Sequence, residues 1–258
     1  MPKYSLTTPL GPNRAKLNGA LSGARNKTML TLIGNPRGNY SDDCRWPTNK
    51  KVLDLIIQKN VGPFKVSGLK PAVETLELIF ADIRAHEPEI YAVLGTAGML
   101  CCRYVRGSTT SISNHSWGTA IDLTLEGVLD KRGDERAQVG LLSIYKYFNA
   151  HSFFWGAAFP TEDAMHFEAS EQLIRTWSAQ GLFGAHPPPL SDEIFELGDR
   201  GPNVKELQEL LNHKLGLDLD ADGIFGPATR AAVMEFQREQ GLPITGALLP
   251  AQLDRLAA

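Results

Sequence analysis

The sequence predicts an α+β domain, with helices packed on a small antiparallel sheet, followed by a small all-α three-helix domain. Up to about residue 180, apolar residues at helical spacing alternate with short strand-like segments; three consecutive prolines follow, and further helical stripes come after them. We therefore expect an N-terminal arm at 1–30, separate or part of the first domain, then a first domain at 31–183, a proline-rich linker at 184–192 and a second domain at 193–258.

In the first domain, four apolar stripes predict four helices, because side chains three or four residues apart share one helix face. The stripes are Val52, Leu53, Ile56 and Ile57 after a cap at Thr48; Val73, Leu76, Phe80 and Ile83 between Pro71 and Pro88; Leu141, Leu142, Tyr145 and Phe148; and Leu173, Ile174 and Trp177 after a cap at Ser170. Short strands are expected near 91–94, 101–105, 120–125, 153–155 and 165–168.

The second domain carries two further helical stripes, and Gly226-Pro227 supplies a helix start between them. The stripes are Val204, Leu207, Leu211 and Leu215, then Ala232, Val233, Phe236 and Gln237.

Two polar clusters in the first domain carry metal-ligand residues. The clusters are Ser113-Asn114-His115-Ser116-Trp117-Gly118-Thr119-Ala120-Ile121-Asp122 and, roughly forty residues later, Asp163-Ala164-Met165-His166-Phe167-Glu168. Zinc accepts two imidazoles and a carboxylate, and three protein ligands leave a fourth position for the water that a hydrolytic site needs. A single histidine is more often an ordinary loop residue, so the prediction depends on His115, Asp122 and His166 together.

Strand alternation supports the assignment, because it puts Asp122 on the polar face of 120–125 and places Glu168 on the same side as His166. Glu168 and Ser113 are then expected to accept hydrogen bonds from ligand imidazoles. Trp117 and Trp155 are candidates to line a substrate cleft, although core or rim positions are the commoner role for such aromatics.

The run Ser-x-His-x-x-Gly-x-Ala-x-Asp resembles the first signature of the zinc D-alanyl-D-alanine carboxypeptidases and L-alanyl-D-glutamate endopeptidases of bacteria and phages, and Asp-x-Met-His-Phe-Glu resembles the second. The resemblance covers roughly residues 33 to 180. It implies that one Zn²⁺ is held by His115, Asp122 and His166, and that Asp163 is the general base, where many members have Glu.

The resemblance also implies an arginine upstream of the first ligand that holds a substrate carbonyl or carboxylate. Arg103 is the first candidate and Arg106 the second. Side chains three apart on a strand face opposite ways, so only one of the two is expected to point at the metal.

Residues 193–258 resemble the three-helix peptidoglycan-binding domain attached to many wall hydrolases. The matching runs are Leu197-Gly198-Asp199-Arg200-Gly201, Asp222-Gly223-Ile224-Phe225-Gly226-Pro227-Ala228-Thr229 and Phe236-Gln237. The two resemblances together imply an endolysin-like zinc peptidase that cuts an amide bond in the stem peptide or cross-bridge of bacterial peptidoglycan. They leave open which of three bonds is cut: L-alanyl-D-glutamate, D-alanyl-meso-diaminopimelate or D-alanyl-D-alanine.

Two alternatives remain at this point. One is a wall-degrading effector of a secretion system with the same chemistry. The other is a non-catalytic wall-binding protein with a structural zinc, as in hedgehog-type relatives, for which a filled fourth coordination position would argue. A carboxylate at Asp163 counts against that second alternative, because a structural site has no use for a base.

Composition and other motifs argue against several further functions and kinds of site. The net charge of −3 argues against a nucleic-acid partner, and no segment reaches the roughly 18 apolar residues of a membrane span. The N-terminus lacks the apolar core of a signal peptide, so we expect synthesis in the cytoplasm and action on the wall after release or injection, as a monomer. The run His86–Ile90 lacks the second histidine of a zinc helix, and the calcium-like loop beginning at Asp218 has Thr229 where a Glu is required.

The three cysteines neither demand nor forbid a disulfide. Cys101 and Cys102 are adjacent, so Cys44 could pair with only one of them, and three buried thiols are the alternative.

Overall fold

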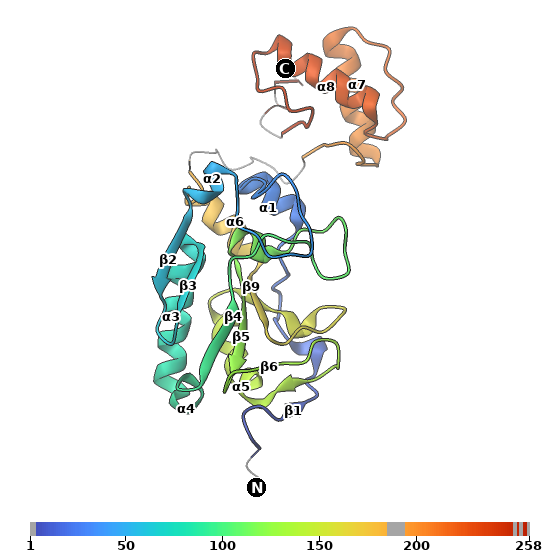
Figure 1. Ribbon diagram of the computed structural model, residues 1–258. Helices are drawn as coiled ribbons and strands as arrows, with labels where there is room; N and C mark the ends of the chain where they lie inside the picture. Colours follow the sequence, from blue (N-terminus) through green and yellow to red (C-terminus); the bar gives the residue numbers. More distant parts are fainter. Residues whose placement is uncertain (1–3, 185–193, 250–251, 253–254, 257–258) are drawn as a thin grey trace. The chain divides into compact units, whose positions relative to one another are not determined.

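The computed structural model describes residues 4–184, 194–249, 252 and 255–256 (Figure 1). The chain divides into two compact units, residues 1–186 and 187–258. Apart from residue 184, the expected linker at 184–192 lies outside the described residues. Among the described residues, no helix combines the length and the apolar character that a membrane crossing requires.

The first unit is built around an antiparallel sheet with the strand order β4-β5-β9-β8, and β6 pairs with β5. The strands are β4 (Leu94–Gly98), β5 (Ala120–Leu125), β6 (Val128–Leu129), β8 (Phe153–Trp155) and β9 (His166–Ala169). In the register between β5 and β9, Asp122 lies directly opposite His166. Backbone pairing alone therefore brings two of the three predicted zinc ligands together.

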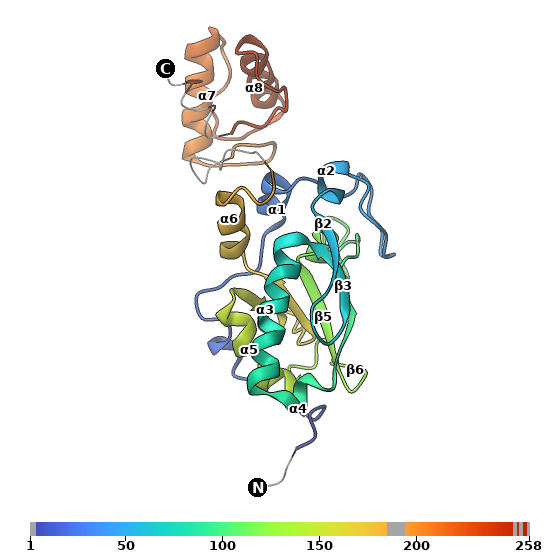
Figure 2. The ribbon, with the colours of Figure 1, turned by 90° about the vertical axis from the view of Figure 1, so that its left-hand side faces the viewer.

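Two helices, α3 (Lys70–His86) and α5 (Val139–Ala150), pack against each other on one side of this sheet (Figure 2). Phe148 of α5 stacks on Phe167 of β9 with ring centroids 4.0 Å apart, and Phe80 of α3 meets Phe148 edge-on at 6.0 Å. These side chains are fully buried. Phe167 and His166 point to opposite faces of β9. The hydrophobic core therefore covers one face of the sheet, and the polar side chains of the candidate site lie on the other.

Both of these helices were predicted, as was α6 (Glu171–Ala179), whose first turn is capped by Ser170 accepting the Leu173 N–H. Each carries a continuous apolar stripe that faces the core. The short α4 (Pro88–Tyr91) restarts after α3 at Pro88.

The predicted helix over Val52 to Ile57 is wrong in its second half. Helix α2 (Lys50–Leu53) ends after one turn, and its cap is Asn49 rather than Thr48. Ile56 begins β2 (Ile56–Asn60), which forms a hairpin with β3 (Lys65–Leu69). Two consecutive β-branched residues suit a strand, and the partner β3 supplies the pairing that a local stripe cannot reveal.

The predicted strand at 101–105 is also wrong, since this stretch forms only isolated bridges, Arg45 with Cys102 and Tyr104 with Ile112. The strand expected near 91–94 begins only at Leu94.

The N-terminal segment packs on the first unit. Strand β1 (Pro9–Leu10) pairs with β7 (Ala137–Gln138), and a 3₁₀ turn, η1 (Arg14–Lys16), follows. The Asn18 side chain donates to the Trp155 carbonyl and accepts from the Trp155 N–H. Helix α1 (Asn26–Leu32), for which no periodicity was recognised, buries Met29 and Leu32.

The second unit is helical, with α7 (Pro202–Leu215) and α8 (Pro227–Glu239) enclosing a separate core around Leu211, Phe225 and Phe236. Two buried glutamines organise its turns. Gln208 accepts the Gly223 N–H at 2.8 Å, and Gln237 accepts the N–H groups of Thr245 and Gly246. The third helix of the expected three-helix domain stays a prediction, because beyond residue 249 the structure describes only residues 252, 255 and 256, which are helical.

Candidate metal centre

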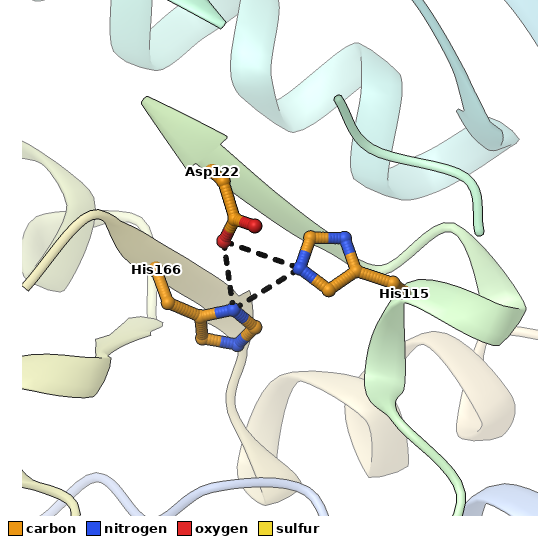
Figure 3. A group of neighbouring side chains, drawn as sticks. All are labelled: His115, Asp122 and His166. Atoms are coloured by element: carbon orange, nitrogen blue, oxygen red, sulfur yellow. Dashed lines mark hydrogen bonds and ion pairs between the residues drawn. The ribbon is translucent and has the colours of Figure 1, made fainter. Parts of the chain in front are cut away.

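Three side chains from three elements meet at one point (Figure 3). His115 comes from the 3₁₀ turn η2 (Asn114–Trp117), Asp122 from β5 and His166 from β9. Nε2 of His115 lies 3.2 Å from Nδ1 of His166 and 3.2 Å from Oδ1 of Asp122, and the third side of the triangle is 3.1 Å. Ligand atoms that surround zinc at about 2.0–2.1 Å in a tetrahedron are about 3.3 Å apart. The donor set and its spacing therefore fit zinc.

Each imidazole turns its other nitrogen to a fixed acceptor. Nε2 of His166 lies 2.9 Å from Oε2 of Glu168, as the alternation along β9 predicts. Nδ1 of His115 lies 2.8 Å from the Met99 carbonyl oxygen. Such partners fix the tautomer and ring orientation of a metal-binding histidine.

The expectation that Ser113 would fill this role for a ligand imidazole is wrong. Among the described residues, no hydrogen bond joins its hydroxyl to either ring, although Ser113 is buried on the cavity wall. The Met99 carbonyl takes the role instead. A backbone acceptor leaves no side-chain signal in the sequence, so motif reasoning could not find it.

Gly118 allows the turn that carries His115 to pack closely on β3. Its φ is +64°, and a Cβ at this position would lie 2.6 Å from the Gly68 Cα. The Gly118 carbonyl accepts the Leu69 N–H at 2.9 Å. A larger residue would have to push the His115 turn away from the β2–β3 hairpin.

The charges of the site favour a cation. Burial alone would raise the pKa of Asp122, but hydrogen bonds from His115 and His166 outweigh it and hold that pKa well below its usual range. Burial lowers the pKa of His166, yet the Asp122 and Glu168 carboxylates on its two sides outweigh this effect and raise the pKa to about 10. In the metal-free protein, a proton on His166 thus supplies the positive charge that a metal would bring.

Asp163 lines the cavity beside these residues, and only one of its two carboxylate oxygens has a partner. Oδ2 forms an ion pair with Nε of Arg132 at 3.2 Å, whereas the buried Oδ1 has no hydrogen-bond partner among the described residues. Burial raises the pKa of Asp163, which makes it a better proton acceptor than an exposed aspartate. A buried oxygen without a partner is costly in a structural carboxylate and is suited to one that receives a proton.

Arg132 has no counterpart in the sequence prediction. Its position follows from Glu162, whose carboxylate accepts the N–H groups of Gly133, Asp134 and Ala164 and so fastens the loop that carries Arg132 beside Asp163. Glu162 also lies near Asp130 and Asp134 in a second acidic group. Because three backbone donors already occupy the Glu162 carboxylate, we interpret this group as a loop fastening.

Two pockets of about 500 Å³ and 570 Å³ adjoin the candidate ligands, and we call them the first and the second lobe. Both lobes are lined by Arg103, Arg106, His115 and Asp122. The expectation that only one of the two arginines would face the site is wrong, because residues 101–105 do not form a regular strand. Burial lowers the pKa of Arg103, and the nearby Asp122 acts in the opposite direction.

Trp117 and Trp155 do not line either lobe. Both are fully buried, and their indole N–H groups donate to the carbonyls of Gly34 and Ala164, each at 2.7 Å. They belong to the core that supports the site.

A disulfide joins Cys44 to Cys101 on the wall of the second lobe, which decides between the two possible partners. Cys102 is a buried thiol whose pKa burial raises to about 11.

Residues 106–169 match the family described as D-alanyl-D-alanine carboxypeptidase, and residues 200–256 match the putative peptidoglycan binding domain. Over 68 residues the chain is 44% identical to a protein of Kitasatospora aureofaciens described as an uncharacterized protein in the bpoA1 3′ region. The match covers 25% of this chain and 58% of that relative, so the chain spans little more than half of the relative's length.

Similar solved structures include a fused zinc-dependent amidase/peptidase/peptidoglycan-binding domain-containing protein of Clostridium acetobutylicum, at 34% identity and a TM-score of 0.25 over 26% of this chain and 30% of that one. A Burkholderia AP3 phage endolysin is 44% identical over 26% of this chain and 25% of that one, also with a TM-score of 0.25. A peptidoglycan-binding protein of Clostridioides difficile is 36% identical over 25% and 40% of the two chains, with a TM-score of 0.24.

The first family match contains all three candidate ligands and Asp163, and the second contains α7 and α8. The first unit thus contains a match to the D-alanyl-D-alanine carboxypeptidase family, and the second unit contains a match to the putative peptidoglycan binding domain.

Proposed function

We propose that this protein is a zinc-dependent peptidoglycan peptidase that hydrolyses an amide bond in the stem peptide or cross-bridge of the bacterial wall. The observation that carries the proposal is the triangle of His115 Nε2, His166 Nδ1 and Asp122 Oδ1, with Asp163 on the same cavity. A bound zinc ion would polarise the scissile carbonyl and lower the pKa of water.

The chain's own residues supply the proton transfers. A water molecule beside Asp163 gives its proton to the free Oδ1 as its oxygen attacks the carbonyl carbon. Asp163 then passes that proton to the amine nitrogen as the C–N bond breaks. Arg132, paired with Oδ2 at 3.2 Å, keeps the carboxylate turned so that Oδ1 remains available.

Arg103 and Arg106 are the cationic groups next to the ligands on both lobes. We assign to Arg103, the more buried of the two, the role of stabilising the developing oxyanion, and to the exposed Arg106 contact with a neighbouring substrate carboxylate. A peptide stem with free carboxylates fits this pair better than an uncharged polymer would.

The second unit would hold the enzyme on the insoluble polymer. A tethered binding domain raises the effective concentration of the catalytic site near its substrate without any new contact at that site. The resulting protein is endolysin-like, and a secreted wall-degrading effector would use the same chemistry.

A purely structural zinc is disfavoured by the number of ligands. Within the described part of the chain, the ligand group around His115 has three members, and a structural zinc site has four.

The proposal is tested by metal analysis together with wall hydrolysis. We expect one zinc per chain in the wild type and loss of zinc in His115→Ala, Asp122→Ala and His166→Ala. Chelation should abolish the release of soluble fragments from purified peptidoglycan, and added Zn²⁺ should restore it. Full zinc occupancy in any two of the three variants would overturn the ligand assignment.

A further inference from the structure

Residues 23–26 form part of the wall of the metal cavity, although they lie some eighty residues before the family match begins. We call Gly23, Ala24, Arg25 and Asn26 the N-terminal clasp. Gly23, Ala24 and Asn26 line the cavity directly. Their backbone and side-chain contacts reach both segments that carry the histidine ligands.

On one side, the clasp holds the strand that carries His166. Gly23 forms a bridge with Ser170, just after β9 ends, and the Ala24 N–H donates to Oε1 of Glu168 at 3.1 Å. The other oxygen of the same carboxylate, Oε2, lies 2.9 Å from Nε2 of His166. The clasp therefore fixes the carboxylate that orients the imidazole.

On the other side, the clasp holds the segment that leads into His115. The Asn26 side chain donates to the Ile112 carbonyl at 2.7 Å and accepts the Ile112 N–H at 2.6 Å. Asn114, next to His115, donates through one side-chain nitrogen to the Ala24 carbonyl at 3.0 Å and to Glu168 Oε2 at 2.9 Å. A single four-residue segment thus ties together the two histidine-bearing parts of the first unit.

The fit at Gly23 leaves no room for a side chain. A Cβ at this position would lie 2.8 Å from Oε1 of Glu168, the atom that accepts the Ala24 N–H. Glu168 is only 4% exposed, and its carboxylate is held by Ala24, Asn114 and His166, so a shift of Oε1 disturbs these contacts. Even one methyl group at residue 23 must displace the group that orients His166.

We propose that the N-terminal clasp is a positioning device for the metal site, which holds His115 and His166 at ligand spacing before the metal arrives. Gly23 and Asn26 act here as positioning residues, through Glu168 and Ile112 respectively. The inference rests on the proposed zinc function, because it concerns the affinity of that site. Partners that orient metal ligands typically contribute about 10–100-fold to metal affinity.

The test compares the Zn²⁺ affinity of Gly23→Ala, Asn26→Ala and the wild type, measured on the full chain by competition with a chromophoric chelator. Each variant should bind Zn²⁺ on the order of 10–100-fold more weakly. Asn26→Asp keeps an acceptor for the Ile112 N–H and should fall between Asn26→Ala and the wild type.

Gln172→Ala is the matched control. Gln172 accepts the Ser22 N–H and donates to the Ala20 carbonyl, so this variant removes contacts between the N-terminal segment and α6 without touching either histidine-bearing segment. The unfolding temperature of this variant without metal should drop, while its Zn²⁺ affinity should stay at the wild-type value. A purely structural role for the clasp would instead lower the unfolding temperature of all the variants and leave all their affinities equal.

The outcomes separate this inference from the proposed function. A wild-type protein that fails to bind Zn²⁺ overturns both. Wild-type binding with unchanged affinity in Gly23→Ala and Asn26→Ala overturns the clasp alone. If Asn26→Ala does not fold, the Zn²⁺ affinity of Gly23→Ala decides whether the clasp positions the site, because this variant removes no hydrogen-bond donor or acceptor.

Discussion

The proton on His166 in the metal-free protein gives a prediction with a definite size. His166 lies between Asp122 and Glu168, at 3.1 Å and 2.9 Å, and its pKa is raised to about 10. An ordinary histidine has a pKa of about 6.5, so at pH 8 only about 3% of such rings are protonated. His166 should remain almost fully protonated at that pH.

Zinc must displace this proton before His166 can become a ligand. The pKa of His166 lies about two units above pH 8. Removing the proton at that pH therefore weakens the apparent Zn²⁺ affinity by about a hundredfold, or about 3 kcal/mol, relative to a neutral ring. Affinity should therefore rise about tenfold per pH unit between pH 7 and 9 from this residue alone.

The same shift sets how the stability of the metal-free protein depends on pH. The folded-state pKa of His166 lies above the unfolded value of about 6.5, so its contribution is fully present below pH 6.5 and is lost as the pH rises through about 10. The metal-free protein should thus become less stable between pH 7 and pH 10.

The direct assay is a pH titration of the imidazole nitrogen resonances of metal-free protein by NMR. One ring should stay in the imidazolium form at pH 8, and Glu168→Gln should lower its pKa by removing one of the two flanking carboxylates. If every histidine is neutral at pH 8, the electrostatic description of the site is wrong.

Three further predictions follow from the site and the two units. Asp163→Ala should keep its zinc but lose on the order of 10²–10⁴ in turnover, measured on soluble muropeptides. Asp163→Glu should retain part of the activity. Wild-type turnover of Asp163→Ala with zinc intact would show that another residue is the general base. Arg132→Ala should lower kcat with little change in KM or zinc content, and Arg132→Lys should recover part of the loss, whereas Arg136→Ala on the same loop should behave as wild type. Residues 1–186 alone should cleave soluble muropeptides yet fail to pellet with sacculi, and the binding-domain interpretation fails if residues 187–258 do not pellet.

The sequence predicted the elements whose signals are local. Helices α3 and α5 follow from apolar stripes longer than two turns, and β5 from alternation next to Asp122. Ile56 and Ile57 misled the prediction because their spacing after Val52 and Leu53 also fits a helix, and only the pairing with β3 makes them a strand. Long-range pairing leaves no local pattern.

In the candidate site, too, local motifs were predicted and long-range contacts were missed. His115, Asp122 and His166 were predicted together because their motifs have a fixed spacing, and the structure brings them together. The Met99 carbonyl and Arg132 were missed, because one is a backbone group and the other is brought in by a loop that Glu162 fastens from thirty residues away. The N-terminal clasp was missed because Asn26 and Ile112 are 86 residues apart in the chain.

The most direct test of the zinc peptidase proposal is mass spectrometry of the fragments that the Zn²⁺-loaded protein releases from purified peptidoglycan, with His166→Ala as the control. We expect fragments with a new amine and a new carboxyl terminus at one bond of the stem peptide or cross-bridge, with one water added in total for each bond cleaved. These products should be absent with His166→Ala. Intact peptides accompanied by new sugar reducing ends, or no soluble fragments from a zinc-loaded and folded protein, would contradict it.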